Sequence, residues 1–135
     1  MQGVPGAAIF AGMKFSVADQ SNGNTIHAYT DNSVVVNGVT FSKSLVIMAD
    51  RIIPDWRPDS FQSLSEEDFA AFVELCPDLV VLGTGQRQQF PDPRLYRALI
   101  DAGIGIEIMT TPAACRTYNI LTSEGRKVIG ALLFN

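Results

Sequence analysis

The sequence predicts a single α/β domain, and three observations lead to that prediction. The chain has 135 residues, of which 47% are hydrophobic and 18% are charged, so it is long enough and apolar enough to bury one ordinary core. Its first half carries short β-branched runs separated by turn residues, which is typical of antiparallel sheet. From residue 65 onward, helical and strand patterns alternate three times, as in parallel strands joined by right-handed crossover helices.

The front of the chain has little pattern before its first strand. Glycine and proline interrupt the start, and the sequence DQSNGN at 19–24 is a loop signal, so we expect a weakly ordered N-terminal segment over 1–24 and a single domain over 25–135. Ile9, Phe10 and Phe15 offer one added edge strand within that segment. Residues 25–29 are expected to form a short strand.

A hairpin is the clearest local prediction. Asn37 and Gly38 stand between β-branched runs over 33–41, and a type I′ turn needs positive φ at both of its central residues. The apolar run at 44–49 predicts a buried strand. Residues 50–63 are interpreted as a connection, in which Trp56 and Phe61 cover a sheet edge or a helix face; the functional alternative is an exposed recognition loop.

The second half begins with a helix capped by Ser65, whose acidic first turn suits the helix dipole. Phe69, Phe72 and Cys76 share one apolar face, which predicts that Cys76 belongs to the core, and Pro77 ends the helix. The elements expected after it are a buried strand at 79–82, a helix from 93 capped by Asp92 with Leu95, Leu99 and Ala102 inward and ended by Gly103, a buried strand at 104–109, a helix at 112–124 capped by Thr111, and a strand at 128–134.

The candidate site lies where two of the parallel strands end. Ligands of open parallel sheets bind outside the carboxyl ends of the strands, and neighbouring ends would place the loop at 83–86 beside the junction at 110–116. Glycines, a helix N-terminus and one arginine favour a small anionic ligand there. The structural alternative is a tight turn and a helix cap. The candidate ligand-binding residues are Gly83, Thr84, Gly85, Gln86, Thr110, Thr111, Cys115, Arg116 and Asn119.

No catalytic residue is assigned. Cys115 would become a reactive thiolate if the helix N-terminus and Arg116 lowered its pKa, but a nucleophile needs a base, and the single histidine, His27, stands near the other end of the chain. A small buried side chain is the favoured interpretation of Cys115. Asn119 shares a helix face with Arg116, and we expect a hydrogen-bonding role for it, either beside Arg116 or on the backbone of an adjacent loop. We expect no metal and no cofactor.

Charge and composition exclude several classes of function. The net charge is −4 and no run of Lys or Arg occurs, so nucleic acid and anionic membrane surfaces are not expected partners. No window approaches the ~20 apolar residues of a membrane helix, so no membrane insertion is expected. Two cysteines form no disulfide framework, and the N-terminus lacks the features of a secretion signal, so a cytoplasmic location is expected.

Three stretches carry a family resemblance: SVVVNGVTFSKSLVIMADRIIPDW, LVVLGTGQRQQF and GIGIEIMTTPAACRTYNILTSEGRKVIGALL. Together they resemble a family of small α/β proteins that includes mitochondrial complex I assembly factor 3 and the adipogenesis-associated domain-containing proteins. The resemblance implies three layers, with a mixed central sheet, crossover helices and a smaller antiparallel β layer from the N-terminal half. It implies no catalytic residue and no cofactor, and its mitochondrial member acts as an assembly partner of a respiratory enzyme.

The expected function is therefore that of a non-enzymatic binding or assembly-type module with another protein as its partner. The alternative is a small-molecule or anion-binding protein, or an enzyme, that uses the crevice formed by 83–86 and 110–116. A thiol-dependent role for Cys115 is a third hypothesis. The sequence leaves the oligomeric state open.

Overall fold

The computed structural model describes residues 23–134, which form one α/β unit built on a mixed sheet. The predicted weakly ordered segment at 1–24, with its added edge strand, lies outside the described residues except for its last two positions. The five strands of the main sheet are β4 (Leu45–Met48), β5 (Arg51–Pro54), β6 (Leu79–Thr84), β7 (Gly105–Met109) and β8 (Val128–Leu133).

The strand order in this sheet is β5-β4-β8-β6-β7. β6 runs parallel to both β7 and β8, and β4 runs antiparallel to β5 and β8, so the predicted mixed central sheet is confirmed. Every residue of β6 and β8 is buried, because these strands are central and covered on both faces. The continuous apolar runs in the sequence are the direct consequence of that position.

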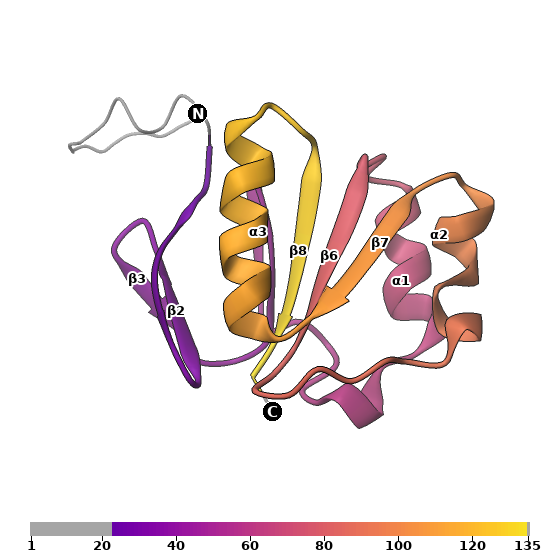
Figure 1. Cartoon of the computed structure of the whole chain (residues 1–135), viewed down its shortest axis with the longest axis horizontal. Helices are drawn as coiled ribbons and strands as arrows, with labels where there is room; N and C mark the ends of the chain where they lie inside the picture. Colours follow the sequence, from indigo (N-terminus) through magenta and orange to yellow (C-terminus); the bar gives the residue numbers. More distant parts are fainter. Residues whose placement is uncertain (1–22, 135) are drawn as a thin grey trace.

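Helices cover both faces of the sheet (Figure 1). One face carries α1 (Glu66–Val73), the 3-10 turn η3 (Pro93–Tyr96) and α2 (Arg97–Asp101), and the other carries α3 (Thr111–Ser123). Alternate strand residues point to opposite faces and fill two separate hydrophobic clusters. Val80 and Leu82 face α1 and α2, whereas Leu79 and Val81 face α3.

A small antiparallel sheet completes the layer on the α3 side. It consists of β1 (Ile26–Thr30), β2 (Ser33–Val36) and β3 (Val39–Phe41) in that order, and Figure 1 shows it on the far side of α3 from β6. The hairpin prediction is confirmed, since Asn37 and Gly38 have φ of 54° and 79°. Ile26, Val34 and Val36 enter the same cluster as α3 and β4, so the small sheet belongs to the core.

The prediction that residues 50–63 form only a connection is wrong. This segment contains β5, an edge strand, followed by the 3-10 turn η2 (Phe61–Ser63). The sequence pattern does not indicate this strand, because it is only four residues long and contains an arginine and a proline. Both residues are common in edge strands. Trp56 is buried as expected, and Phe61 is half-buried.

Cys76 is the second correction. The helix α1 is capped by Ser65 as predicted but ends at Val73, three residues before Cys76, whose backbone has φ of 52° and whose side chain is exposed. The apolar period continues past the end of the helix, so periodicity alone wrongly placed Cys76 in the core.

Three local predictions in the second half are also wrong. The helix from residue 93 is a 3-10 turn followed by five α-helical residues, and Ala102 is exposed, although Gly103 ends it with φ of 75°. β7 is an edge strand with no fully buried residue, and not the buried strand predicted. The cap of α3 is Thr110, whose hydroxyl accepts a hydrogen bond from Ala113 N, whereas Thr111 is the first helical residue.

Candidate functional site

The carboxyl ends of β6 and β7 lie side by side, as the candidate crevice requires. Gly83 is in register with Met109, and Thr84 is the last residue of β6. Gly83 and Thr84 are therefore strand residues, and the loop begins at Gly85. The two chain segments predicted to line one crevice are neighbours in the fold.

Thr111 occupies the space between these strand ends. Its hydroxyl donates to Leu133 O and accepts a 2.8 Å hydrogen bond from Gly85 N, while its own backbone N–H donates to Gly85 O at 2.8 Å. A Cβ added to Gly83 would lie 2.8 Å from Thr111 Oγ1 and 3.0 Å from Thr111 Cα. The glycine thus allows the first turn of α3 to pack directly on β6.

Thr84 is fully buried and is bonded within the same junction. Its hydroxyl lies 2.7 Å from Arg87 O and 3.2 Å from Met109 O, and it accepts a 3.2 Å hydrogen bond from Gln89 N. A ligand in this crevice would have to displace bonds that already satisfy these buried groups, at an unfavourable desolvation cost.

Three further candidate residues reach to the small sheet. The side-chain amide of Asn119 accepts from Ile26 N at 2.9 Å and donates to Ile26 O at 2.8 Å, so it pairs with β1 as a neighbouring strand would. Arg116 donates to the Tyr29 hydroxyl at 2.7 Å, and Gln86 donates to Asp31 O at 2.6 Å. Arg116 and Asn119 thus bond to β1 and not to each other.

Cys115 is fully buried in the cluster between α3 and the sheet. Burial raises the pKa of its thiol to about 12, against a smaller opposing effect from Arg116. The thiol is therefore neutral at pH 7. A ligand-binding role for the nine candidate residues stays a prediction, while the contacts show that most of them connect elements of the fold.

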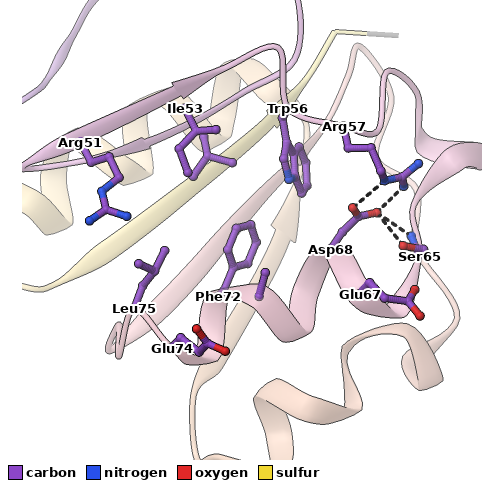
Figure 2. A pocket seen from close by; sticks show the side chains of 12 residues that line it. Arg51, Ile53, Trp56, Arg57, Ser65, Glu67, Asp68, Phe72, Glu74 and Leu75 are labelled. Carbon is purple, nitrogen blue, oxygen red and sulfur yellow. Dashed lines mark hydrogen bonds and ion pairs between the residues drawn. The ribbon is translucent and has the colours of Figure 1, made fainter.

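A groove between β5 and α1 is a hollow that the sequence did not predict (Figure 2). Its volume is about 610 Å³, within the range of small-molecule pockets. Trp56 and Phe72 form its floor, with ring centroids 5.8 Å apart in a stacked arrangement. Ile53 from β5 and Leu75 beyond α1 add half-exposed aliphatic walls. The only sequence signal for it was the exposed-loop alternative for Trp56.

One end of the groove is held by a hydrogen-bonded cluster. Arg57 donates two bonds to Asp68, from Nε at 2.8 Å and from Nη2 at 2.5 Å, and Asp68 also accepts from Ser65 N at 2.8 Å and from Ser65 Oγ at 3.0 Å. Burial alone would raise the pKa of Asp68, but these hydrogen bonds outweigh it and lower the pKa below its usual 3.8. Asp68 is thus ionised at neutral pH and fixes the start of α1 to the β5 loop.

The rest of the groove rim carries charges that are not bonded. Arg51 on the β5 side and Glu67 and Glu74 on the α1 side are exposed, and within residues 23–134 their side chains make no hydrogen bond or ion pair. Figure 2 shows Arg51 above Leu75 and Glu74 at one end, and Glu67 near the Arg57–Asp68 pair at the other. A second hollow of about 380 Å³, which includes Lys43, continues from the groove past Trp56 and Arg57.

Residues 23–134 were compared with the requirements of a metal site and of a membrane-spanning helix, and they meet neither. No three His, Cys, Asp or Glu side chains in that part are grouped to hold a metal ion, and none of its helices is long and apolar enough to cross a membrane.

Fold and groove together define a class: a small α/β protein with a mixed five-stranded sheet, a β layer fastened to α3, and a surface groove beside an edge strand. The chain belongs to the family described as "Protein of unknown function (DUF498/DUF598)", whose model matches residues 26–133. The family expected from the sequence is thereby confirmed.

Named relatives and solved structures agree with this assignment. NADH dehydrogenase [ubiquinone] 1 alpha subcomplex assembly factor 3 of Bos taurus is 37% identical over 110 residues, which are 80% of this chain and 59% of the relative. A crystal structure from Bordetella parapertussis has a TM-score of 0.77 at 36% identity, covering 83% of this chain and 96% of that one. A Bordetella pertussis solution structure described as a Mth938-like domain has a TM-score of 0.70 at 32% identity, covering 82% and 85%.

The chain spans about 59% of the length of the bovine assembly factor that it matches.

Proposed function

We propose that this chain is a non-enzymatic protein-binding module of the assembly type, and that the groove between β5 and α1 is its contact surface. The observation that carries the proposal is the contrast between two places. The junction at the strand ends is filled by its own hydrogen bonds, whereas the groove is open, has apolar walls and bears three exposed charges, Arg51, Glu67 and Glu74, that make no hydrogen bond or ion pair within residues 23–134.

The comparisons support the partner class. The bovine relative is named as an assembly factor for a subcomplex of NADH dehydrogenase, and its name implies contact with other proteins. An apolar centre with a charged rim is the usual composition of a protein–protein contact. The particular partner, and the cytoplasmic location expected from the sequence, remain predictions for this chain.

Affinity purification with a pair of variants tests the proposal. Ala71→Arg places a long side chain in the groove from an exposed position of α1, and Ile100→Arg makes a comparable change on exposed α2. We expect the wild-type chain and Ile100→Arg to retain the same partner from cell extract, and Ala71→Arg to lose it. Recovery of no stable partner, or equal recovery by both variants, would count against the proposal.

Anion or small-molecule binding at the strand ends is the second candidate, and one observation favours it. Arg116 is exposed beside this end and forms no ion pair within the described residues. The second candidate predicts that phosphate or a carboxylic acid raises the melting temperature and that Arg116→Ala abolishes the rise. A thermal-shift screen that finds no change with phosphate, nucleotides or carboxylic acids would remove it.

A further inference from the structure

The groove lies where the helical layer leaves the sheet uncovered. On this face α2 packs against β7 at one edge of the sheet, and α1 packs against α2. β5 forms the opposite edge, and within residues 23–134 no helix lies beyond α1 on that side; the groove occupies the place instead. The vacant place has the form that one more helix in this layer would fill, with the sheet beneath it and α1 beside it.

The α1 wall has the pattern of a helix-packing surface. Glu67, Ala71 and Glu74 stand at positions i, i+4 and i+7, where Glu74 is the C-cap residue and keeps helical backbone angles, and all three are exposed and line the groove. Two residues seven apart on a helix are about 10.5 Å apart along its axis, so the two carboxylates flank a small central residue. The small side chain of Ala71 permits close approach of a neighbouring helix. The two glutamates that flank it favour a neighbour with positive charge.

Addition of a strand to β5 is less favoured by the same residues. β5 is only four residues long, begins with the charged Arg51 and ends with Pro54, which lacks a backbone N–H. These are features that protect an edge strand from pairing. The groove also lies on the face of the sheet, between Ile53 and α1, and not along the hydrogen-bonding edge.

A second copy of this chain does not supply the complementary charge in its described helices. α1 carries three acids in its first turn and no base. α2 has one arginine, and the single arginine of α3, Arg116, is bonded to Tyr29. None of these helices carries two basic side chains two turns apart.

We propose that the groove binds an amphipathic helix of a partner protein, in which two basic side chains two turns apart pair with Glu67 and Glu74. The apolar stripe of that helix lies against Ile53 and Leu75, over the Trp56–Phe72 floor, and an acidic residue on its opposite side reaches Arg51. This inference rests on the proposed protein-binding function and names the chemistry of its partner. The exposed charges set selectivity and association rate, and the apolar stripe contributes most of the affinity.

Site-specific cross-linking tests this inference. A photo-reactive amino acid is placed at Ala71 in the full chain, the cells are irradiated, and the attached peptides are identified by mass spectrometry. We expect them to come from one segment of a partner protein that has an apolar stripe and two Lys or Arg residues seven positions apart. In vitro, the purified complex should weaken with rising salt.

Matched charge variants make the test specific. Glu67→Lys with Glu74→Lys should reduce capture about tenfold or more, because like charges then face each other. Glu107→Lys with Glu124→Lys, at exposed positions of β7 and the end of α3, changes the net charge equally and should leave capture unchanged. Glu67→Gln with Glu74→Gln should give an intermediate loss, and melting curves of all variants confirm folding. Reversal of the two partner bases to Glu should restore capture by the Lys variant.

Three results would overturn the inference: a captured segment without the paired bases, capture of a second copy of this chain, or capture that the Glu67 and Glu74 changes do not alter. Its failure is distinguishable from that of the proposed function. If Ala71→Arg loses the partner as expected but the segment cross-linked at Ala71 lacks the paired bases, or the Glu67 and Glu74 changes leave capture unaltered, the proposed function stands and this inference fails. If no partner is recovered in either experiment, both fail.

Discussion

At the residue scale, α3 is fastened to the small sheet by side chains that replace backbone partners. Asn119 bonds to both polar groups of Ile26, and the hydroxyl of Tyr118 donates to Asn24 O at 2.8 Å. The Tyr118 ring fits because residue 130 is glycine, where an added Cβ would lie 3.2 Å from Tyr118 Cδ1 and 2.9 Å from Ile47 Cγ2. The hydrogen bonds of Asn119 and Tyr118 span 93 and 94 residues of sequence and tie the N-terminal layer to the rest of the fold.

We expect Asn119→Ala to lower the free energy of unfolding by about 1–3 kcal/mol, because it leaves the N–H and C=O of Ile26 without partners in a partly buried place. Arg116→Ala removes an exposed bond and should cost about 0.5 kcal/mol or less. Urea unfolding of the two variants measures the difference. Equal losses would show that the Asn119 pairing does not hold β1 in place.

The two cysteines should differ in reactivity in the folded chain. Cys76 is exposed, whereas Cys115 is buried with the pKa of its thiol raised to about 12 by desolvation. A thiol reagent at pH 7 should therefore modify one site rapidly and the other only as the chain unfolds. Cys76→Ser should abolish the fast phase. Native-state labelling of Cys115 at the rate of a free thiol would instead support the thiol-dependent hypothesis.

Stability should fall as the pH rises from 9 to 12. The pKa of Cys115 is raised from 9.0 to about 12 and that of Tyr118 from 10.0 to about 12, in both cases chiefly by burial. In this window the unfolded chain has lost protons that the folded chain retains, so rising pH favours unfolding. Chemical denaturation at several pH values should show this slope, and Cys115→Ala should flatten it. A slope that Cys115→Ala leaves unchanged would contradict the assigned burial.

At the element scale, the position of α1 depends on its first turn. Ser65, Asp68 and Arg57 form one cluster that joins the helix to the segment after β5, and this cluster closes one end of the groove. The orientation of the α1 wall, and hence of Glu67, follows from it.

We expect Asp68→Asn to destabilise the chain by about 1 kcal/mol at pH 7, as loss of a helix cap usually does. The pKa of Asp68 is lowered in the folded chain, so its stabilising contribution is present above pH 3.8 and is lost as the pH falls below that value. The variant should therefore show a smaller loss of stability on acidification than the wild type. Asp101→Asn on α2 is the control, and a similar change in acid response for both variants would argue against the cluster.

Elements were predictable where a local signal decides the conformation. The Asn37–Gly38 turn and the Ser65 cap were found because each rests on a few adjacent residues. β5 was not, because pairing with β4 makes it a strand despite a sequence without alternation. Cys76 was misplaced because apolar periodicity does not reveal where a helix stops.

At the scale of the whole molecule, the α/β class and the mixed sheet could be read from the order of patterns, but the groove could not. The groove is formed by β5 and by the side of α1 that faces away from α2. Its apolar floor depends on the packing of Trp56 on Phe72. The junction of β6, β7 and α3 was located correctly as a place. Its hydrogen bonds to Gly85 and Leu133 required the three-dimensional arrangement, since they depend on the neighbouring position of β8.

We propose above that this molecule binds a protein through the groove between β5 and α1. Hydrogen–deuterium exchange of the purified complex, compared with the free chain, tests it most directly. We expect slower exchange in β5 and over residues 66–75, with the first turns of α3 unchanged. Protection confined to the start of α3 and the loop after β6, with β5 and α1 exchanging as in the free chain, would contradict it.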